Sequence, residues 1–442
     1  KSFMAEPRPF LKQLEATQSP VVKFRLAHMK VYYLTSPEAT LHVMQRKHQN
    51  YYKGGPSMNI GRKTMGNGLV FSDDDFWKRQ RRIANPAFHT DCLNYYTEVM
   101  QGRTQDMVNN LQARAKLGEV NMYDHFNQLA IEIVKDNLFG GSLSDLEMDV
   151  MLRSINYLLE EMSKHIRTGF MLPFWIPTAS NRKMLKAMRE SEEIVTNLFR
   201  NKANEKEQGH TLLDMLIHTP DPETGEHMSP QQIADEIKIF FLAGTDTSAN
   251  VMSFLAFELA NHRDIQAKVR AEVKEVLGDR APSMADCKQL AYTQTVIKEA
   301  LRRYAPGWMV SRSAKEADTI EGIDIPKGAQ LFVSPLMMHH HPDYWENPDK
   351  FDPDRWSPER KDRNNSKAFM PFTVGPRKCI GSRFAELEIT IAIAMLMQQF
   401  ELQPSKVRTA EVEYSGTLRP KEGQLPLRLI PLKKEEPIPA VF

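Results

Sequence analysis

Cys379 is one of three cysteines in the chain, and its surroundings differ from those of the other two. It lies in the segment PFTVGPRKCIG, which runs from Pro371 to Gly381 and places two basic residues directly before it. Cys92 and Cys287 lack such a glycine-framed turn. An odd, widely spaced set of cysteines argues against a disulfide framework. Cys379 is therefore either a core residue or a thiolate that reacts or binds a metal.

A second candidate site lies inside a long apolar helix. Ser229 and Pro230 fit the N-cap and first turn of a helix that continues for about thirty residues and must cross the centre of the protein. Its middle carries AGTDTS, where a glycine costs about 1 kcal/mol and a threonine hydroxyl can bond a carbonyl one turn back. Two interpretations follow: a glycine at a helix crossing, or a groove in which a small ligand meets Asp246 and Thr247.

Three charged residues form a possible lock. Glu299 and Arg302 are three residues apart in IKEALRRYAP, so their side chains can pair on one helix face. Such pairs are usually exposed to solvent and contribute little to stability. FDPDRW places Arg355 in a proline-pinned turn further along the chain. A buried glutamate between two arginines would instead fix these segments together.

The elements that must position these residues are mostly helices. The chain has 442 residues and a net charge of +2, which gives no indication of nucleic-acid binding. VVKFRLAHMKVYYL predicts two short strands, after which Ser36 and Pro37 open a helix. GIDIPKGAQLFVSP (322–335) predicts a second hairpin-like patch. The run His339–His341 has no matching set of metal ligands and is expected on a surface turn.

Together these segments resemble the cytochrome P-450 family, the haem-thiolate monooxygenases, over nearly the whole chain. The cysteine loop fits the family pattern F-x-x-G-x-R-x-C-x-G, and AGTDTS is similar to the oxygen-activation motif of the family's central helix. The segment GNGLVFSDDDFWKRQRRIANPAFH is most similar to the branch of fatty-acid and sterol hydroxylases. The residues of the loop pattern are Phe372, Gly375, Arg377, Cys379 and Gly381.

Two further motifs carry the resemblance. Glu299, Arg302 and Arg355 fit the salt-bridge triad of the family. FWKRQRR supplies Trp77 and Arg81 at the W-x-x-x-R spacing of the helix that covers a haem propionate. All these motifs occur in the family's order and approximate spacing.

The implied fold class is mainly α with small β-sheets, a triangular helical haem domain with a long central helix over the haem. The resemblance implies one domain spanning 1–442. Within it we expect a β-rich N-terminal lobe at about 15–60, a helical body at about 75–320 and the haem-ligand loop at 371–381.

The implied cofactor is haem b, with Cys379 as the axial iron ligand. A thiolate donates electron density to iron, and it needs stabilisation as an anion. Gly375 and Gly381 would permit a tight loop whose N–H groups point at the sulfur, and the following helix would face it with its N-terminus. Phe372 would pack near the sulfur and limit water access. The other implied cofactor contacts are Trp77, Arg81, Ala243, Gly244, Arg312 and Arg377.

The implied reaction inserts one oxygen atom of O2 into a C–H bond of an apolar substrate: a fatty acid, sterol or terpenoid. Gly244 would let the helix open a groove, Thr247 would hydrogen-bond the activated oxygen, and Asp246 would supply protons from solvent. One alternative is a haem-thiolate peroxygenase, isomerase or dehydratase that does not activate O2. Another is a non-catalytic haem sensor. The acid–alcohol pair favours the monooxygenase.

The substrate pocket is expected to depart from the family pattern. After Arg302 the family often has Y-P-P-x-P, whereas this chain has RYAPGWMVSR. A glycine at this place leaves room for a bulky substrate, with a tryptophan as an aromatic wall and a methionine that adapts to its shape. The pocket residues expected are Phe241, Gly307, Trp308 and Met309.

Electrons are expected to come from a separate donor, a ferredoxin or an FMN/FAD reductase, since no such domain follows Cys379 in this sequence. A basic proximal face would dock the donor, near Lys78, Arg79, Arg82 and Lys378. We expect a monomer that does not bind nucleic acid. The sequence has no run of eighteen apolar residues and predicts no membrane span. The expected location is the cytoplasm if the N-terminus is native, and a membrane if an anchor was removed.

Overall fold

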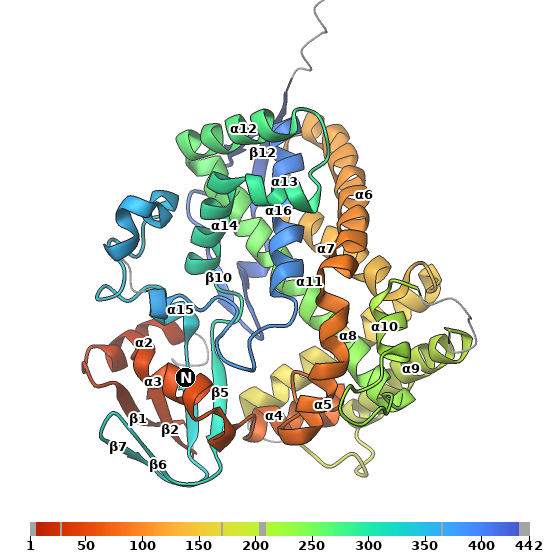
Figure 1. The fold of residues 1–442 in the computed structure, drawn as a ribbon, viewed down its shortest axis with the longest axis vertical. Helices are drawn as coiled ribbons and strands as arrows, with labels where there is room; N and C mark the ends of the chain where they lie inside the picture. Colours follow the sequence, from red (N-terminus) through yellow and green to blue (C-terminus); the bar gives the residue numbers. More distant parts are fainter. Residues whose placement is uncertain (1–5, 27–28, 169–170, 203–208, 364–365, 433–442) are drawn as a thin grey trace, which may run out of the picture.

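The computed structural model describes residues 6–432 apart from 27–28, 169–170, 203–208 and 364–365. Helices make up most of it, and the small sheets lie mainly at one side of the helical body (Figure 1). The helices are α2 (Pro7–Glu15), α3 (Pro37–Leu41), α4 (Pro56–Met65), α5 (Asp74–Ala84), α6 (Thr90–Arg114), α7 (Met122–Phe139), α8 (Asp145–Thr168), α9 (Ala179–Lys202), α10 (Leu212–His218), α11 (Pro230–Asn261), α12 (Arg263–Leu277), α13 (Met284–Gln289), α14 (Ala291–Arg303), α15 (Pro335–Met338) and α16 (Ser382–Gln399). The expected fold class is confirmed.

The largest sheet joins the N-terminal region to a later part of the chain. Its strand order is β1-β2-β8-β5-β3, with β1 antiparallel to β2 and β2 parallel to β8. The strands are β1 (Val21–Leu26), β2 (Met29–Leu34), β3 (Tyr51–Tyr52), β5 (Val310–Ala314) and β8 (Gln330–Val333). The two strands predicted near the N-terminus are thus confirmed, and Ser36 caps α3 by accepting the N–H of Ala39.

The second predicted hairpin is wrong in its pairing. β7 (Ile323–Ile325) pairs with β6 (Asp318–Ile320), whereas β8 leaves for the large sheet. The turn between β7 and β8 contains Pro326 and Gly328, whose φ of +77° favours glycine. This turn sends the chain from one sheet into another and does not close a hairpin.

Two smaller sheets lie near the C-terminal part of the chain. β12 (Pro426–Pro431) pairs with β9 (Phe400–Pro404) and β4 (Glu119–Asn121). β10 (Val412–Tyr414) and β11 (Leu418–Pro420) form an antiparallel hairpin. The turn of this hairpin reaches α11, and it becomes important below.

Helix α11 is the central element of the fold. The Ser229 hydroxyl accepts the N–H of Gln232, whose side chain accepts the N–H of Ser229, so a capping box starts the helix as predicted. Among the described residues, only α11 is long and apolar enough to span a membrane, but 67% of its most apolar window is buried within the protein. The helix is therefore better explained as the core helix of a globular body.

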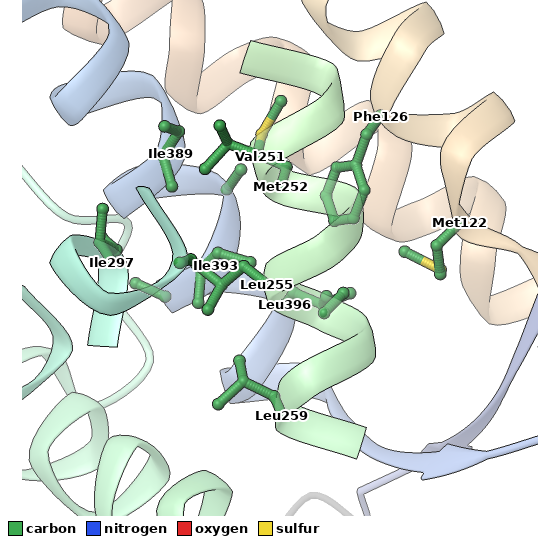
Figure 2. Close-up of a cluster of buried hydrophobic side chains, with 14 of the residues drawn as sticks. Met122, Phe126, Val251, Met252, Leu255, Leu259, Ile297, Ile389, Ile393 and Leu396 are labelled. Carbon is green, nitrogen blue, oxygen red and sulfur yellow. The ribbon is translucent and has the colours of Figure 1, made fainter. Parts of the chain in front are cut away.

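The core around α11 is built from helices distant in sequence. Apolar side chains of α11 interdigitate with those of α16, α14 and α7 (Figure 2). Each fully buried aliphatic side chain contributes about 1.5–3 kcal/mol. The labelled members are Met122, Phe126, Val251, Met252, Leu255, Leu259, Ile297, Ile389, Ile393 and Leu396. This packing fixes α11 relative to α16, which starts directly after the cysteine loop.

Candidate functional site

An apolar cavity of about 340 Å³ lies between α11 and the cysteine loop. Thr247 from α11 and Cys379 from the loop both line it. The structure therefore brings the thiol and the hydroxyl of the central helix to the wall of one cavity. The predicted site residues that line this cavity are Ala243, Gly244, Thr247, Gly307, Phe372, Arg377, Cys379 and Gly381.

The cysteine loop holds its sulfur by backbone contacts. The N–H of Cys379 donates to the carbonyl of Phe372 at 3.0 Å. Burial raises the pKa of the Cys379 thiol, while the Gly381 N–H and the nearby charges of Arg81 and Lys378 act to lower it. The exposed surface of the Cys379 side chain faces the cavity. Such a setting suits a thiolate ligand shielded from bulk water.

The two loop glycines have different physical roles. Gly375 has φ +76°, and a Cβ there would lie 2.1 Å from the carbonyl oxygen of Met44, so only glycine fits. Gly381 has φ −85°, which any residue adopts, and a Cβ there would meet only a ring atom of Phe88 at 3.8 Å. The expectation that Gly381 permits the tight turn is therefore wrong; its contribution is an N–H near the sulfur.

The AGTDTS motif combines both interpretations offered by the sequence. A Cβ on Gly244 would lie 2.8 Å from Cγ2 of Val134 on α7, so the glycine permits a close helix crossing. The hydroxyl of Thr247 donates to the carbonyl of Ala243 at 2.8 Å, one turn earlier. Helical residues continue without a break from Pro230 to Asn261. Contrary to expectation, the helix does not open into a groove at Gly244. Instead, Gly244 contacts α7 closely, and the cavity lies beside this contact.

Asp246 does not line the cavity. Its Oδ2 accepts the hydroxyl proton of Thr417, which lies in the turn between β10 and β11. The amide of Asn250, one helical turn further along α11, donates to the same hydroxyl at 3.2 Å. Sequence reasoning missed Thr417, because no local pattern connects it to α11.

A buried cluster of positive charge lies beside the cavity. Arg377 donates to the Asp73 carboxylate at 2.8 Å, and Arg62 donates to the same carboxylate at 2.6 Å. Burial lowers the pKa values of Arg312 and Arg377 to about 10 each. It also lowers the pKa of Lys53 well below its ordinary value, assisted by the charges of Arg312 and Arg377. Cations thus outnumber the carboxylate that they share.

This charge excess fits the propionates of a haem. Two added carboxylates would compensate buried guanidinium groups that now share Asp73, and the apolar cavity with Cys379 would accept the ring. Of this cluster, sequence reasoning found Arg312 and Arg377 but missed Lys53, Arg62 and Asp73. Only Asp73 had a local signal, since it lies just before FWKRQRR and directly precedes α5.

Two predicted haem contacts, Trp77 and Arg81, do not line the cavity but contact the cysteine loop. The guanidinium carbon of Arg377 lies 3.8 Å from the centre of the Trp77 ring. Arg81 donates to the carbonyl of Lys378 at 3.0 Å, directly before the cysteine. Neither Trp77 nor Arg81 is among the cavity-lining residues. Both therefore support the loop from α5.

Three predicted pocket residues point elsewhere. Phe241 is buried in packing away from the cavity, and its neighbour Phe240 lines the cavity instead, because one position on a helix turns the side chain by about 100°. Trp308 donates its indole N–H to the carbonyl of Ser415. Met309 packs against the apolar cluster that contains Leu11, Tyr33 and Met337. Of the four, only Gly307 lines the cavity.

The predicted basic face is partly neutralised. Arg82 donates from two nitrogens to the carboxylate of Asp221, at 2.8 and 2.9 Å, and also pairs with Glu223. Arg79 pairs with Asp221 and Glu226. Arg79 and Arg82 therefore hold the loop before α11 and do not offer free charge to a partner, because acidic residues distant in sequence fold against them.

The three lock residues meet as the motif suggests. Glu299 accepts from Arg302 at 2.9 Å and from Arg355 at 3.0 Å, and all three side chains are fully buried. Arg302 also donates to the carbonyl of His339, and the N–H of Asp352 donates to Glu299. A buried carboxylate between two guanidinium groups ties α14 to the loop that precedes the cysteine segment.

The histidine run is not on a surface turn. His339 is completely buried; its Nδ1 bonds the carbonyl of Arg302, and its Nε2 accepts the N–H of Met370. His340 is also buried and bonds the carbonyl of Leu336. Among the described residues, no group of three or more His, Cys, Asp or Glu could hold a metal ion. These histidines are structural, and the expectation of an exposed turn is wrong.

Comparison with known proteins agrees with this geometry. The sequence profile of the cytochrome P-450 family matches residues 3–427. Cyclooctatin synthase from Streptomyces melanosporofaciens is 32% identical over 400 residues, which cover 90% of this chain and 86% of that protein. Cyclooctat-9-en-7-ol 5-monooxygenase from the same organism is 28% identical over 398 residues, which cover 90% and 85%. The crystal structure of the cytochrome P-450DA haem domain has a TM-score of 0.86 at 24% identity and covers 97% of this chain and 93% of that chain. The chain therefore belongs to the cytochrome P-450 family of haem b monooxygenases.

Proposed function

We propose that this P-450 monooxygenase hydroxylates a bulky, ring-containing apolar substrate, such as a terpenoid or sterol. The observation that carries this proposal is the space at Gly307. This residue lines the cavity, and a Cβ there would meet no atom within 4 Å. Branched or cyclic substrates need such room next to the reacting centre. The name of one relative, cyclooctat-9-en-7-ol 5-monooxygenase, points to the same kind of substrate.

The residues of the site divide the work of the reaction. Haem b, when bound through Cys379, supplies the activation of O2 and the oxidation of the C–H bond. Arg377 and Arg312 would hold the propionates, with Lys53 beside them. Thr247 places a hydroxyl at the cavity wall, where its Oγ1 could hold or pass a proton once haem is bound. Apolar side chains such as Phe240 exclude bulk water.

Electrons would enter from a separate protein near Cys379. Lys298, Lys378 and Arg383 are exposed. Burial raises the pKa of Glu386, and the charges of these three residues oppose that rise, so they lie around the same carboxyl. They replace Arg79 and Arg82 as the proposed docking face for an acidic ferredoxin or flavin reductase.

Arg383→Glu should raise the KM for an acidic ferredoxin without changing substrate binding. Arg428→Glu, an exposed residue on β12, is the matched control, and equal effects of both substitutions would contradict this docking face.

One experiment tests the function itself. The haem-loaded protein is screened against terpenoids, sterols and fatty acids for a low-to-high-spin absorbance shift, and products are measured with NAD(P)H and a surrogate reductase. We expect a hydroxylated cyclic product that requires O2. Turnover with peroxide but not with NAD(P)H would indicate a peroxygenase, and preference for linear fatty acids would overturn the substrate proposal. Cys379→His should lose the red-shifted carbonyl band of thiolate-ligated haem.

A further inference from the structure

We propose that Thr417, in the turn of the β10–β11 hairpin, is a positioning residue that orients the carboxyl of Asp246 for proton delivery to the cavity. The inference rests on the monooxygenase reaction proposed above and on the role expected of Asp246 from the sequence, which is to supply protons from solvent. It adds that a C-terminal hairpin controls this acid. The contacts around the turn carry the argument.

The hydroxyl of Thr417 has a defined direction. Its oxygen accepts the amide N–H of Asn250 at 3.2 Å, so its single proton is free to be donated to Oδ2 of Asp246. A hydroxyl has one proton, and the Asn250 contact uses an oxygen lone pair. Asn250 is fully buried, so the donor that fixes this direction is itself held in place. The result is a directed chain from Asn250 through Thr417 to Asp246.

This chain keeps the Asp246 carboxyl outside the cavity. Thr247, the next residue, lines the cavity, whereas Asp246 does not. Tyr123 on α7 and Arg419 on β11 lie close enough to Asp246 for its charge to act on them. Arg419 is partly exposed and pairs with Glu413 at 2.9 Å. Asp246 therefore lies beside the charged side chains of the hairpin and directly precedes Thr247 on α11, so it can carry a proton from the hairpin side towards the cavity.

The same turn is attached to the cavity wall. The N–H of Leu418 donates to the carbonyl of Pro306 at 2.9 Å, and the indole of Trp308 donates to the carbonyl of Ser415 at 3.0 Å. Pro306 and Gly307 line the cavity. A substrate that presses on this wall is thus connected, through two hydrogen bonds, to the turn that holds Asp246. Loss of the Thr417 hydroxyl should free the carboxyl from this control.

Misplaced protonation has a measurable result in this reaction. When O2 takes up two electrons and two protons without oxidising the substrate, it can leave the enzyme as hydrogen peroxide, so the share of NAD(P)H electrons recovered in product reports on proton delivery. The test variant is Thr417→Val, which keeps the side-chain shape and removes the hydroxyl. Thr417→Ser restores the hydroxyl. Ser415→Ala is the matched control, because the Ser415 hydroxyl belongs to the same turn and donates to the carbonyl of Thr417, not to Asp246.

With the haem-loaded enzyme, Thr417→Val should lower the yield of product per electron about threefold, with a matching rise in peroxide. The solvent isotope effect on NAD(P)H consumption should change as well, while substrate affinity and the carbonyl spectrum stay as in the wild type. Thr417→Ser and Ser415→Ala should behave as the wild type. A Thr417→Val enzyme with unchanged yield and isotope effect would overturn the inference. If the wild type itself makes no product from O2, the proposed function fails, which is a separate result.

A second readout needs no turnover. The urea midpoints of the wild type, Thr417→Val, Asp246→Ala and the double variant form a double-mutant cycle. If the two side chains interact as described, the double variant should lose less stability than the sum of the single losses. Additive losses would show that the contact is energetically absent and would overturn the inference even if the enzyme proved active.

Discussion

The guanidinium of Arg377 stacks on the indole of Trp77, 3.8 Å from the ring centre, while two of its nitrogens donate to the carbonyl of Ser72 and the carboxylate of Asp73. A residue of the ligand loop is thus fixed on three sides by α5 and the turn before it. Stacking and the planar fork both need arginine, since a lysine offers a point charge without either.

Arg377→Lys should therefore weaken haem retention although it keeps the charge. We expect faster transfer of haem to apomyoglobin and a loss of about 1–3 kcal/mol in the free energy of unfolding. Trp77→Phe keeps an aromatic face and should lose less than Trp77→Leu. Haem transfer at the wild-type rate in Arg377→Lys would show that the fork is dispensable.

Glu299→Gln should be strongly destabilising. It leaves Arg302 and Arg355 buried with their positive charges uncompensated, and the expected loss is about 3–5 kcal/mol in the free energy of unfolding. Urea unfolding of the carbonyl complex measures it. Glu401→Gln is the control, because Glu401 pairs with Arg263 at the surface and should lose less than about 1 kcal/mol. Similar losses in both variants would contradict a buried lock.

Gly307→Phe should alter product distribution without loss of folding. The position faces open cavity space, and its φ lies outside the left-handed region, so a ring would project over the substrate. Gly375→Ala is the contrasting variant: its Cβ would lie 2.1 Å from a backbone oxygen at positive φ, so we expect poor haem incorporation. Identical products at identical rates in Gly307→Phe would place residue 307 outside the pocket.

Stability should fall as the pH rises from about 5 to 8, in part because of Glu388. Burial raises the pKa of this carboxyl from 4.5 to about 8, against a smaller lowering by the Ser248 hydroxyl. The folded state then keeps a proton that the unfolded chain has lost, so its advantage is complete below about pH 4.5 and disappears through pH 8. Glu388→Gln should flatten this slope. Part of it should persist, because burial also raises the pKa of Glu236 to about 8. A slope unchanged by Glu388→Gln would contradict the assignment.

The features that could be predicted from the sequence are those that depend only on residues close together in the chain. A helix start such as Ser229–Pro230 depends on side-chain oxygens a few residues away, and β1 and β2 are each marked by their own apolar residues. The loop around Cys379 likewise carries its geometry locally, as the left-handed Gly375 shows. The place of Cys379 beside the cavity could therefore be predicted from this local pattern.

Features that depend on distant partners could not be predicted. The charges of Arg79 and Arg82 look available until Asp221 is known to fold against them. Phe241 and Phe240 differ by one helical step, and only the packing of α11 decides which of them faces the cavity. Thr417 has no signal, because its partner lies on another element far along the chain.

The close approach of Gly375 to the carbonyl of Met44 has a consequence for how this chain folds during its synthesis. It joins a late segment to one near the start, and contacts across such a sequence span form slowly because the loop entropy is large. During synthesis the cysteine emerges from the ribosome long after the apolar α11. The nascent chain must therefore protect the face of α11 that later packs against α16 until the loop around Cys379 is in place. Supply of haem at the end of translation, and chaperones before it, should then govern the yield of active enzyme in a cell.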